Sequence, residues 1–394
     1  MDFVFIAITA AKIIGFTFLI ILPLIAYSVY AERRVSAIIQ DRVGPNRTGI
    51  PLTLLGGKKD IAFAGLLQPL ADGLKFILKE DFTPKHARTA FYWMAPVLTM
   101  VPSLLTLCVI PFGNEIAVGD TKIPLVIADL NVGPLFIFAI SSLAVYGITL
   151  AGWASNSKYP FLGGIRSTAQ MVSYEIALGL SIVPVLMIFG ELNLNNIVRD
   201  QAAGGWLLMP LWNEGGHLLS GGYWANGGLT QWILMVPLLI SFIIFTTSIF
   251  AETNRMPFDL PECETELVGG YHTEYSSMKF ALFFLGEYAA MIVGSALIVT
   301  LFFGGWSIGF GIDQAYLNPD GSSPIWLALL QFGAFLTKLV VFIIFFIWVR
   351  WTVPRFRYDQ LMNLGWIVFF EGAVINVFLT AGVLYLAHSQ GWAL

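Results

Sequence analysis

Residues 251–288 read AETNRMPFDLPECETELVGGYHTEYSSMKFALFFLGEY, an acidic segment set between two long apolar runs. The segment carries seven of the chain's 25 acidic residues, namely Glu252, Asp259, Glu262, Glu264, Glu266, Glu274 and Glu287. The nearby cationic partners are Arg255, His272 and Lys279. A carboxylate at membrane depth costs roughly 2.5–3.5 kcal/mol on insertion scales. A sequence that keeps these acids is therefore expected to use them, either to move protons or to hold a charged partner.

The composition outside this segment predicts an all-α, polytopic membrane protein. The chain is 57% hydrophobic and 12% charged, with a mean hydropathy of +0.76, and apolar runs of about 20 residues recur along it. A single membrane domain, 1–394, is expected, and the first run is predicted to be a span and not a signal peptide. About eight transmembrane helices are predicted, near 3–31, 90–112, 131–153, 169–190, 229–251, 276–303, 326–350 and 364–388. Residues 65–78 are shorter and carry charges, so they predict an interfacial amphipathic helix.

The cysteines and histidines argue against a redox centre within the chain. Cys108 and Cys263 lie far apart, and the four histidines show no metal-ligand spacing. No Gly-rich phosphate loop follows a strand pattern. We expect no metal or bound cofactor in this chain alone, so that any electrons come from elsewhere. The mild net charge of −4 also argues against nucleic acid as a partner.

Lysine and arginine predict the orientation in the membrane. The segments after helices one, three, five and seven hold 17 of the 21 basic residues. The predicted cytoplasmic segments are 32–89, 154–168, 252–275 and 351–363. The predicted outer segments are 113–130, 191–228 and 304–325, with the N-terminus outside. We assign no function to the long outer segment 193–228.

The first cytoplasmic segment leaves two interpretations open. Arg33, Arg34 and Gln40 either anchor the first helix before a Gly-Pro turn or form a polar mouth where a lipid-soluble ligand leaves the bilayer. Asp72 either pairs with Lys75, three residues further along a helix, or belongs to a polar path into the membrane.

Several intramembrane charges are candidates for a proton path. Glu175 lies about two turns inside a predicted span with no cation within a turn, and Glu287 continues the acidic segment into the membrane. Glu262 and Glu266 share a face if their segment is helical, and Glu264 then points elsewhere. Clustered, buried acids are expected to have raised pKa values. The third helix offers Ser141 and Ser142 but no acid, so a polar relay there would use hydroxyls, water or other helices.

Two further intramembrane charges, Lys338 and Glu371, are expected to pair with each other. They lie on the predicted helices 326–350 and 364–388.

Five of these runs resemble one known family. They are residues 32–49 (ERRVSAIIQDRVGPNRTG), 65–81 (GLLQPLADGLKFILKED), 152–175 (GWASNSKYPFLGGIRSTAQMVSYE), 251–288 and 350–366 (RWTVPRFRYDQLMNLGW). Together they resemble the H subunit of the proton-pumping NADH–quinone oxidoreductase, respiratory complex I, whose mitochondrial counterpart is subunit one. The resemblance extends from about residue 25 to 366. It departs at Phe370-Glu371, where the family has Leu-Pro.

The resemblance implies a membrane subunit that helps to form a quinone chamber and couples quinone reduction to proton translocation. The implied quinone-binding residues are Arg33, Arg34, Gln40 and Asp72. The implied proton path comprises Glu175, Glu252, Asp259, Glu262, Glu264, Glu266 and Glu287. The implied charge-balancing residues are Arg166, Arg255, Arg350 and Arg357.

The resemblance also implies partners and a location. FMN, iron–sulfur clusters and the NADH site would lie in partner subunits, with hydrophilic quinone-site subunits on the cytoplasmic face and other membrane-arm subunits alongside. A bacterial plasma membrane is the expected location.

The sequence alone leaves other functions possible. The chain could anchor a related membrane-bound hydrogenase or ferredoxin-fed complex. A standalone proton or cation transporter and a purely structural anchor are alternatives of a different class. The chain has no internal repeat of the kind found in inverted-repeat transporters, and a structural anchor leaves the intramembrane acids unexplained.

Overall fold

The computed structural model describes residues 3–50, 61–118, 121–208, 229–318 and 321–389. Within these residues it confirms an all-α polytopic architecture, with eight helical segments long and apolar enough to cross a membrane. The segments are Ile8–Ile39, Thr89–Val109, Gly133–Ala154, Lys158–Phe189, Ile233–Glu252, Ser277–Phe302, Ile325–Thr352 and Tyr358–Ser389. The apolar runs of the sequence account for this count, because each can satisfy its backbone hydrogen bonds only as a helix in lipid.

Three of the spans, besides the one that ends in a 3-10 turn, are built from consecutive helical pieces. The first joins α1 (Phe3–Ile14), the π-helical η1 (Gly15–Ile21) and α2 (Leu22–Ile39). The third joins α5 (Gly133–Ser141) and α6 (Leu143–Ala154), and the last joins α14 (Tyr358–Asn363), the π-helical η6 (Leu364–Phe369) and α15 (Phe370–Ser389).

The other spans and the connecting elements complete the described chain. The remaining spans are α4 (Thr89–Thr106) with the 3-10 turn η3 (Leu107–Val109), α7 (Lys158–Phe189), α9 (Leu229–Glu252), α11 (Ser277–Phe302) and α13 (Ile325–Thr352). Short helices are α3 (Gln68–Leu78), α8 (Leu194–Gly204), α10 (Glu264–Leu267), η5 (Gly270–His272) and α12 (Ile312–Ala315). Two small antiparallel pairs join β1 (Gly49–Ile50) with β2 (Ile61–Ala62) and β3 (Ile116–Val118) with β4 (Thr121–Ile123).

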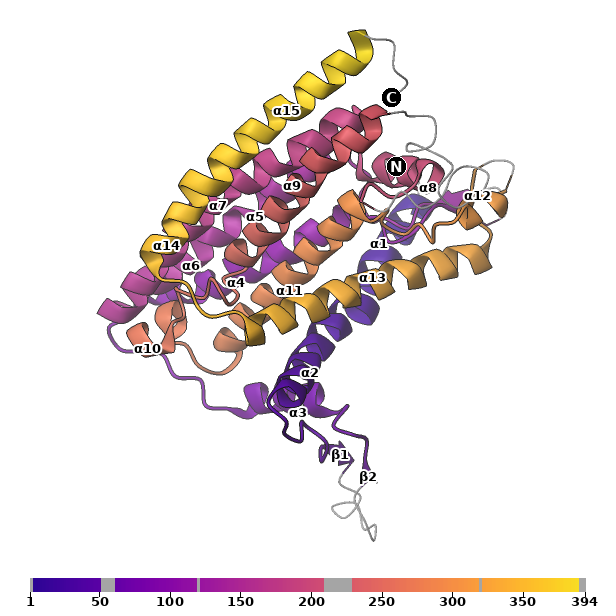
Figure 1. Cartoon of the computed structure of the whole chain (residues 1–394). Helices are drawn as coiled ribbons and strands as arrows, with labels where there is room; N and C mark the ends of the chain where they lie inside the picture. The colour runs from indigo at the N-terminus through magenta and orange to yellow at the C-terminus, as the bar shows by residue number, and fades with distance from the viewer. Residues whose placement is uncertain (1–2, 51–60, 119–120, 209–228, 319–320, 390–394) are drawn as a thin grey trace.

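Helix α11 lies at the centre of the bundle. It is the most buried span, with 72% of its apolar window inside the protein, and it packs against α2, α3, α4, α8, α9 and α13. Figure 1 shows α15 along one edge of the bundle and α2 with α3 towards the opposite edge. Polar side chains on α11 are therefore enclosed by the rest of the chain.

Helix α7 begins at Lys158, earlier than the predicted start at 169. The polar and glycine-rich residues there favour a loop by composition, yet they pack closely. A Cβ on Gly152 would stand 2.5 Å from the Pro160 carbonyl oxygen, and one on Gly163 would stand 2.7 Å from the Tyr271 nitrogen. Glycine therefore allows α6, α7 and η5 to meet backbone to backbone.

The amphipathic helix predicted for 65–78 is present as α3, which buries none of its residues within the chain. Its exposed apolar side chains include Leu70, Leu74 and Leu78. Most of the outer segment 193–228 lies outside the described residues, since only residues up to 208 are described there.

Lys338 and Glu371 do not pair as the sequence suggested. The Lys338 ammonium donates to the carbonyl oxygens of Phe303, Gly305 and Ser307 at 2.8, 2.9 and 2.6 Å, while Glu371 is exposed. The carbonyls lie just beyond the end of α11, where helix geometry leaves backbone acceptors without partners. Lys338 satisfies them, and this requirement outweighs a pairing with a distant acid.

Candidate functional site

Four elements bring a buried group of charges together. The ion-pair cluster consists of Glu32 on α2, Arg255 just after α9, Glu287 and Tyr288 on α11, and Arg350 on α13. The Arg255 side chain is only 4% exposed. Its Nη1 lies 2.8 Å from a Glu32 oxygen and its Nε lies 2.5 Å from a Glu287 oxygen.

Glu32 accepts from three directions within this cluster. Besides Arg255, Arg350 forms an ion pair with its other oxygen, and the Tyr288 hydroxyl donates to it at 2.6 Å. The Arg255 guanidinium also stacks 4.1 Å above the Tyr288 ring. Burial alone would lower the pKa of Arg255, but Glu287 and Glu32 hold that pKa well above its ordinary value. Arg255 therefore stays protonated in contact with the two acids.

A cavity of about 500 Å³ lies beside this cluster. Its walls come from α2, α3, the first half of α11 and Trp351, and most of its lining is apolar, including Phe76, Phe280 and Phe284. The polar side chains that line it include Glu32, Arg33, Ser36, Asp72 and Tyr288. Since Glu32 and Tyr288 belong to both, the cavity and the ion-pair cluster share a wall.

The mouth residues predicted from the first cytoplasmic segment divide into two groups. Arg33 forms an ion pair with Asp72 at 2.9 Å, and both line the cavity. The pairing of Asp72 with Lys75 is therefore replaced by one with Arg33, assisted by Gln68 at 3.0 Å. Arg34 instead lies against Gly44, and Gln40 is exposed and lies outside the cavity lining.

The segment after Arg255 forms a second polar group. Asp259 pairs with Arg355 at 3.0 Å, and Glu262 accepts from the Tyr271 hydroxyl at 2.9 Å. Burial raises the pKa of Asp259 to about 7, helped by the neighbouring Glu262 and opposed by Arg355. A carboxyl with that pKa is poised to exchange a proton near neutral pH.

Glu262 and Glu266 do not share a helix face. Helix α10 begins only at Glu264, so Glu262 precedes it. The chain turns back at Gly270, whose positive φ of +63° places it where a Cβ would overlap the Pro261 carbonyl. Glu266 points instead to Arg166, at 2.6 Å. The side chain of Glu264 lies outside the described residues.

Arg357 contacts Asp359 at 3.0 Å on the surface, and this pair is exposed on both sides. The structure therefore places Arg357 with an acid outside the predicted path. The other three predicted cations, Arg166, Arg255 and Arg350, each contact an acid in or next to that path.

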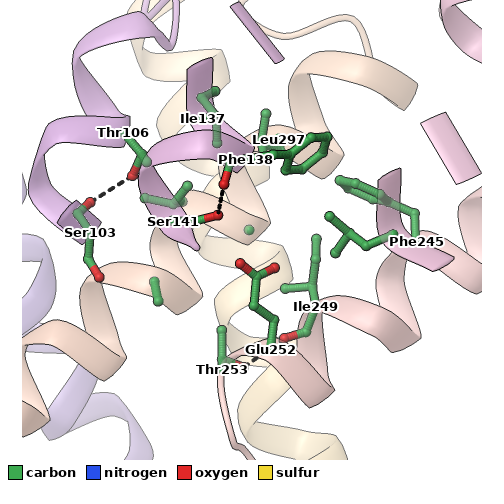
Figure 2. A pocket seen from close by; sticks show the side chains of 14 residues that line it. Ser103, Thr106, Ile137, Phe138, Ser141, Phe245, Ile249, Glu252, Thr253 and Leu297 are labelled. Carbon is green, nitrogen blue, oxygen red and sulfur yellow. Dashed lines mark hydrogen bonds between the residues drawn. The ribbon is translucent and has the colours of Figure 1, made fainter. Parts of the chain in front are cut away.

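Glu252 ends α9 and faces a separate cavity of about 30 Å³, large enough for about two water molecules. Figure 2 shows its carboxylate directed towards Ser141, with Ser103 and Thr106 beyond. The Ser141 hydroxyl donates to the Phe138 carbonyl at 3.2 Å and lines the same small cavity as Glu252. Glu175 is close enough to Glu252 for the two acids to interact electrostatically. A hydroxyl on the third span thus lies beside an acid of the predicted path.

Some residues of the cluster were not singled out from the sequence. Glu32 stands beside the arginines of the first cytoplasmic segment, and its position at the end of an apolar run was a usable signal. Tyr288 directly follows Glu287 but carries no charge to mark it. Arg355 balances Asp259, although composition alone did not distinguish it from Arg357.

Comparison with known proteins identifies the family of this arrangement. The family model for NADH dehydrogenase matches residues 11–381. The H 1 subunit of the NADH-quinone oxidoreductase of Cytophaga hutchinsonii is 43% identical over 95% of this chain and 96% of its own length. The H 1 subunit of Geobacter metallireducens is 45% identical over 97% and 98%, and the H subunit of Salinibacter ruber is 47% identical over 90% and 89%. The chain therefore belongs to the NADH dehydrogenase family, among the H subunits of the NADH-quinone oxidoreductase complex.

Proposed function

We propose that this chain contributes to the quinone-binding chamber of its complex and passes the effect of quinone reduction to a line of carboxylates. The observation that carries the proposal is the wall shared by the cavity and the ion-pair cluster. Glu32 and Tyr288 line the cavity and at the same time contact Arg255. A change of charge in the cavity is therefore felt directly by buried groups of the cluster.

The cavity has the features expected of a site for a lipid-soluble ring compound. Ligand sites are mostly apolar hollows of about 300–1,000 Å³ with a few placed polar groups. Phe76, Phe280 and Phe284 offer apolar and aromatic surface. Arg33 offers donors to the quinone oxygens, and Asp72 offers an acceptor to a hydroxyl of the quinol. In this proposal Arg34 and Gln40 act outside the cavity, at the approach to it.

Reduction of a quinone to a quinol takes up two electrons and two protons. The electrons come from FMN and iron–sulfur groups of partner subunits, which take them from NADH. The negative charge that accompanies reduction attracts Arg255 and Arg350 and weakens their hold on Glu32 and Glu287. The ion-pair cluster then redistributes its charge, because a buried ion pair is stable only when both partners stay matched.

The remaining acids extend this line. Glu262 is close enough to Glu287 and to Asp259 for their charges to interact. Glu252 lies three residues before Arg255 in the chain. Glu175 lies near Glu252 in space, close enough for the two acids to interact electrostatically. Water and the hydroxyls of Ser141, Ser103 and Thr106 complete a route for protons beside Glu252. Glu264 and Glu266 lie at its cytoplasmic end, with Arg166.

The orientation forms part of the same proposal. The basic segments 32–89, 154–168, 252–275 and 351–363 face the cytoplasm of a bacterial cell, where hydrophilic partner subunits cover the chamber. The N-terminus and the segments 113–130, 191–228 and 304–325 face the outside.

The test replaces Glu32 with Gln in the assembled complex. Electron transfer from NADH to a hydrophilic artificial acceptor should stay normal, since it bypasses the quinone. Quinone reduction should fall at least about tenfold, the equivalent of about 1.4 kcal/mol in the barrier. The control is Asp359→Asn, which alters an exposed pair away from the cavity. Normal quinone reduction by assembled Glu32→Gln complex contradicts the proposal.

A further inference from the structure

Glu371 lies in the middle of a membrane span. The helix that contains it runs without interruption through α14, η6 and α15, from Tyr358 to Ser389. At 1.5 Å per residue, Glu371 stands roughly 20 Å from one end of this helix and 27 Å from the other. Its carboxyl is therefore far from either membrane surface.

Glu371 faces away from the rest of its own chain. The opposite side of α15 is buried at Ala373, Asn376 and Thr380 and packs on α7 and α9. The Asn376 amide there donates to the Pro237 carbonyl and to the Ser241 hydroxyl, each at 2.9 Å.

The exposed face of α15 is a helical stripe with Glu371 as its acid. Its apolar members include Val368, Ile375, Phe378 and Tyr385, which are 55%, 65%, 73% and 72% exposed. With Glu371 these positions are spaced three, four or seven residues apart, Val368 near the end of η6 and the others on α15, so they lie on one side of the continuous helix. We call this set of five residues the Glu371 face.

The Glu371 face is costly if it meets only lipid. An acid at the centre of a membrane helix costs roughly 2.5–3.5 kcal/mol on insertion scales. The described part of the chain provides no ion-pair partner for Glu371, and Lys338 is committed to three backbone carbonyls. Since the described residues offer no compensating charge, another chain is the candidate source.

We propose that the Glu371 face binds a transmembrane helix of a partner membrane subunit that presents a lysine or arginine at mid-depth opposite Glu371. The curated relatives are subunits of a complex, so other membrane chains are at hand. Charge complementarity selects a cationic partner, and the large apolar side chains on either side of Glu371 supply packing surface for a helix. Figure 1 shows α15 at the edge of the bundle away from α2 and α3, so this interface is separate from the cavity.

The first test compares Glu371→Leu with Val341→Leu, a change at an exposed residue of α13 outside the Glu371 face, in the complex purified in mild detergent. If the face meets only lipid, Glu371→Leu removes a cost and leaves the subunit composition unchanged. If the face binds a cationic helix, Glu371→Leu and Glu371→Gln should both reduce retention of one membrane subunit. The expected loss is about five- to thirtyfold, which corresponds to an intramembrane polar contact of 1–2 kcal/mol. Val341→Leu should retain that subunit fully.

The second test uses a photo-crosslinking residue at Phe378, with the same residue at the exposed Val341 of α13 as a comparison. Irradiation of the purified complex should join Phe378 to a transmembrane peptide of another subunit that contains a lysine or arginine. Lipid adducts alone at Phe378 would overturn the interface, and normal retention in Glu371→Gln would overturn the cationic partner. Neither result bears on the cavity, so failure here leaves the proposed function standing.

Discussion

Arg255 contacts two carboxylates through different nitrogens, and each carboxylate belongs to a different helix. Removing the arginine would leave Glu32 and Glu287 buried beside each other without a matching charge. Loss of one partner from a buried ion pair costs about 3–5 kcal/mol, whereas exposed pairs such as Arg357–Asp359 contribute about 0–1 kcal/mol. Because its buried charges must stay matched, the ion-pair cluster is also sensitive to charge in the neighbouring cavity.

Asp259 is predicted to titrate near neutral pH. Burial, with Glu262 nearby, raises its pKa to about 7, although Arg355, Arg350 and Arg255 oppose the shift. Its folded pKa exceeds the ordinary value of 3.8, so the folded protein binds this proton more tightly. The contribution of Asp259 to stability therefore falls as pH rises from about 4 to 7, and the carboxyl ionises as pH passes about 7.

Infrared difference spectra of the complex measure this titration. A protonated-carboxyl band should disappear between about pH 6 and 8 in the wild type and be missing in Asp259→Asn. Asp359→Asn, which alters an exposed acid, should keep the band. A band that is the same in Asp259→Asn and the wild type would show that Asp259 is not the titrating group.

At the scale of elements, the contacts of Ser277 and Lys279 fix α3 and the residues after it to the start of α11. We call these contacts the clamp. Ser277 donates to the carbonyls of Phe76 and Lys79, and Lys279 contacts Asp81 at 3.0 Å and Thr83 at 2.8 Å. Lys279 is buried and lies 4.0 Å over the Trp93 ring. Since α3 buries none of its own residues, this clamp and the Arg33–Asp72 pair hold it beside the cavity.

Lys279→Met should therefore loosen the chain after α3. A hydrogen bond to a charged group contributes about 1.5–3 kcal/mol, so amide hydrogen exchange in residues 76–83 should speed up by about ten- to a hundredfold. Lys75→Met, which changes an exposed lysine on α3, is the matched control. Exchange mass spectrometry of the complex measures both, and an unchanged rate in Lys279→Met would mean that the clamp does not hold α3.

The elements were more predictable from the sequence than the contacts between them. Each apolar run predicted its span because length and hydropathy alone decide membrane insertion. The start of α7 was wrong, since Gly163 and Lys158 resemble a loop until the close packing of glycines is known. The pairing of Asp72 was also wrong, because the sequence showed the nearby Lys75 and not the spatial neighbour Arg33.

The ion pair between Glu32 and Arg255 could not be predicted from the sequence. Glu32 and Arg255 are separated by 223 residues, and no local periodicity connects them. The acids themselves were predictable, because a charge inside an apolar run is conspicuous. Their partners depend on how α2, α9, α11 and α13 come together, which only the folded structure gives.

At the scale of the whole molecule, α11 connects the large cavity with the small cavity beside Glu252. Its first turns line the cavity and supply Glu287 and Tyr288, and its later turns line the small cavity of Glu252. The large cavity, the ion-pair cluster and Glu252 thus lie on the central helix and its immediate neighbours, and Glu175 follows on α7, which packs against α9. Quinone reduction and proton movement should consequently fail together when any part of this line is removed.

The most direct test is Glu252→Gln in the complex reconstituted into lipid vesicles, with quinone reduction and proton translocation recorded on the same sample. The matched control is Glu191→Gln, an exposed acid outside the line. Glu252→Gln should lower both rates together by at least about tenfold, as for loss of a proton-transfer group, while Glu191→Gln should leave both unchanged. An assembled Glu252→Gln complex that reduces quinone and pumps protons at the normal rate would contradict this prediction.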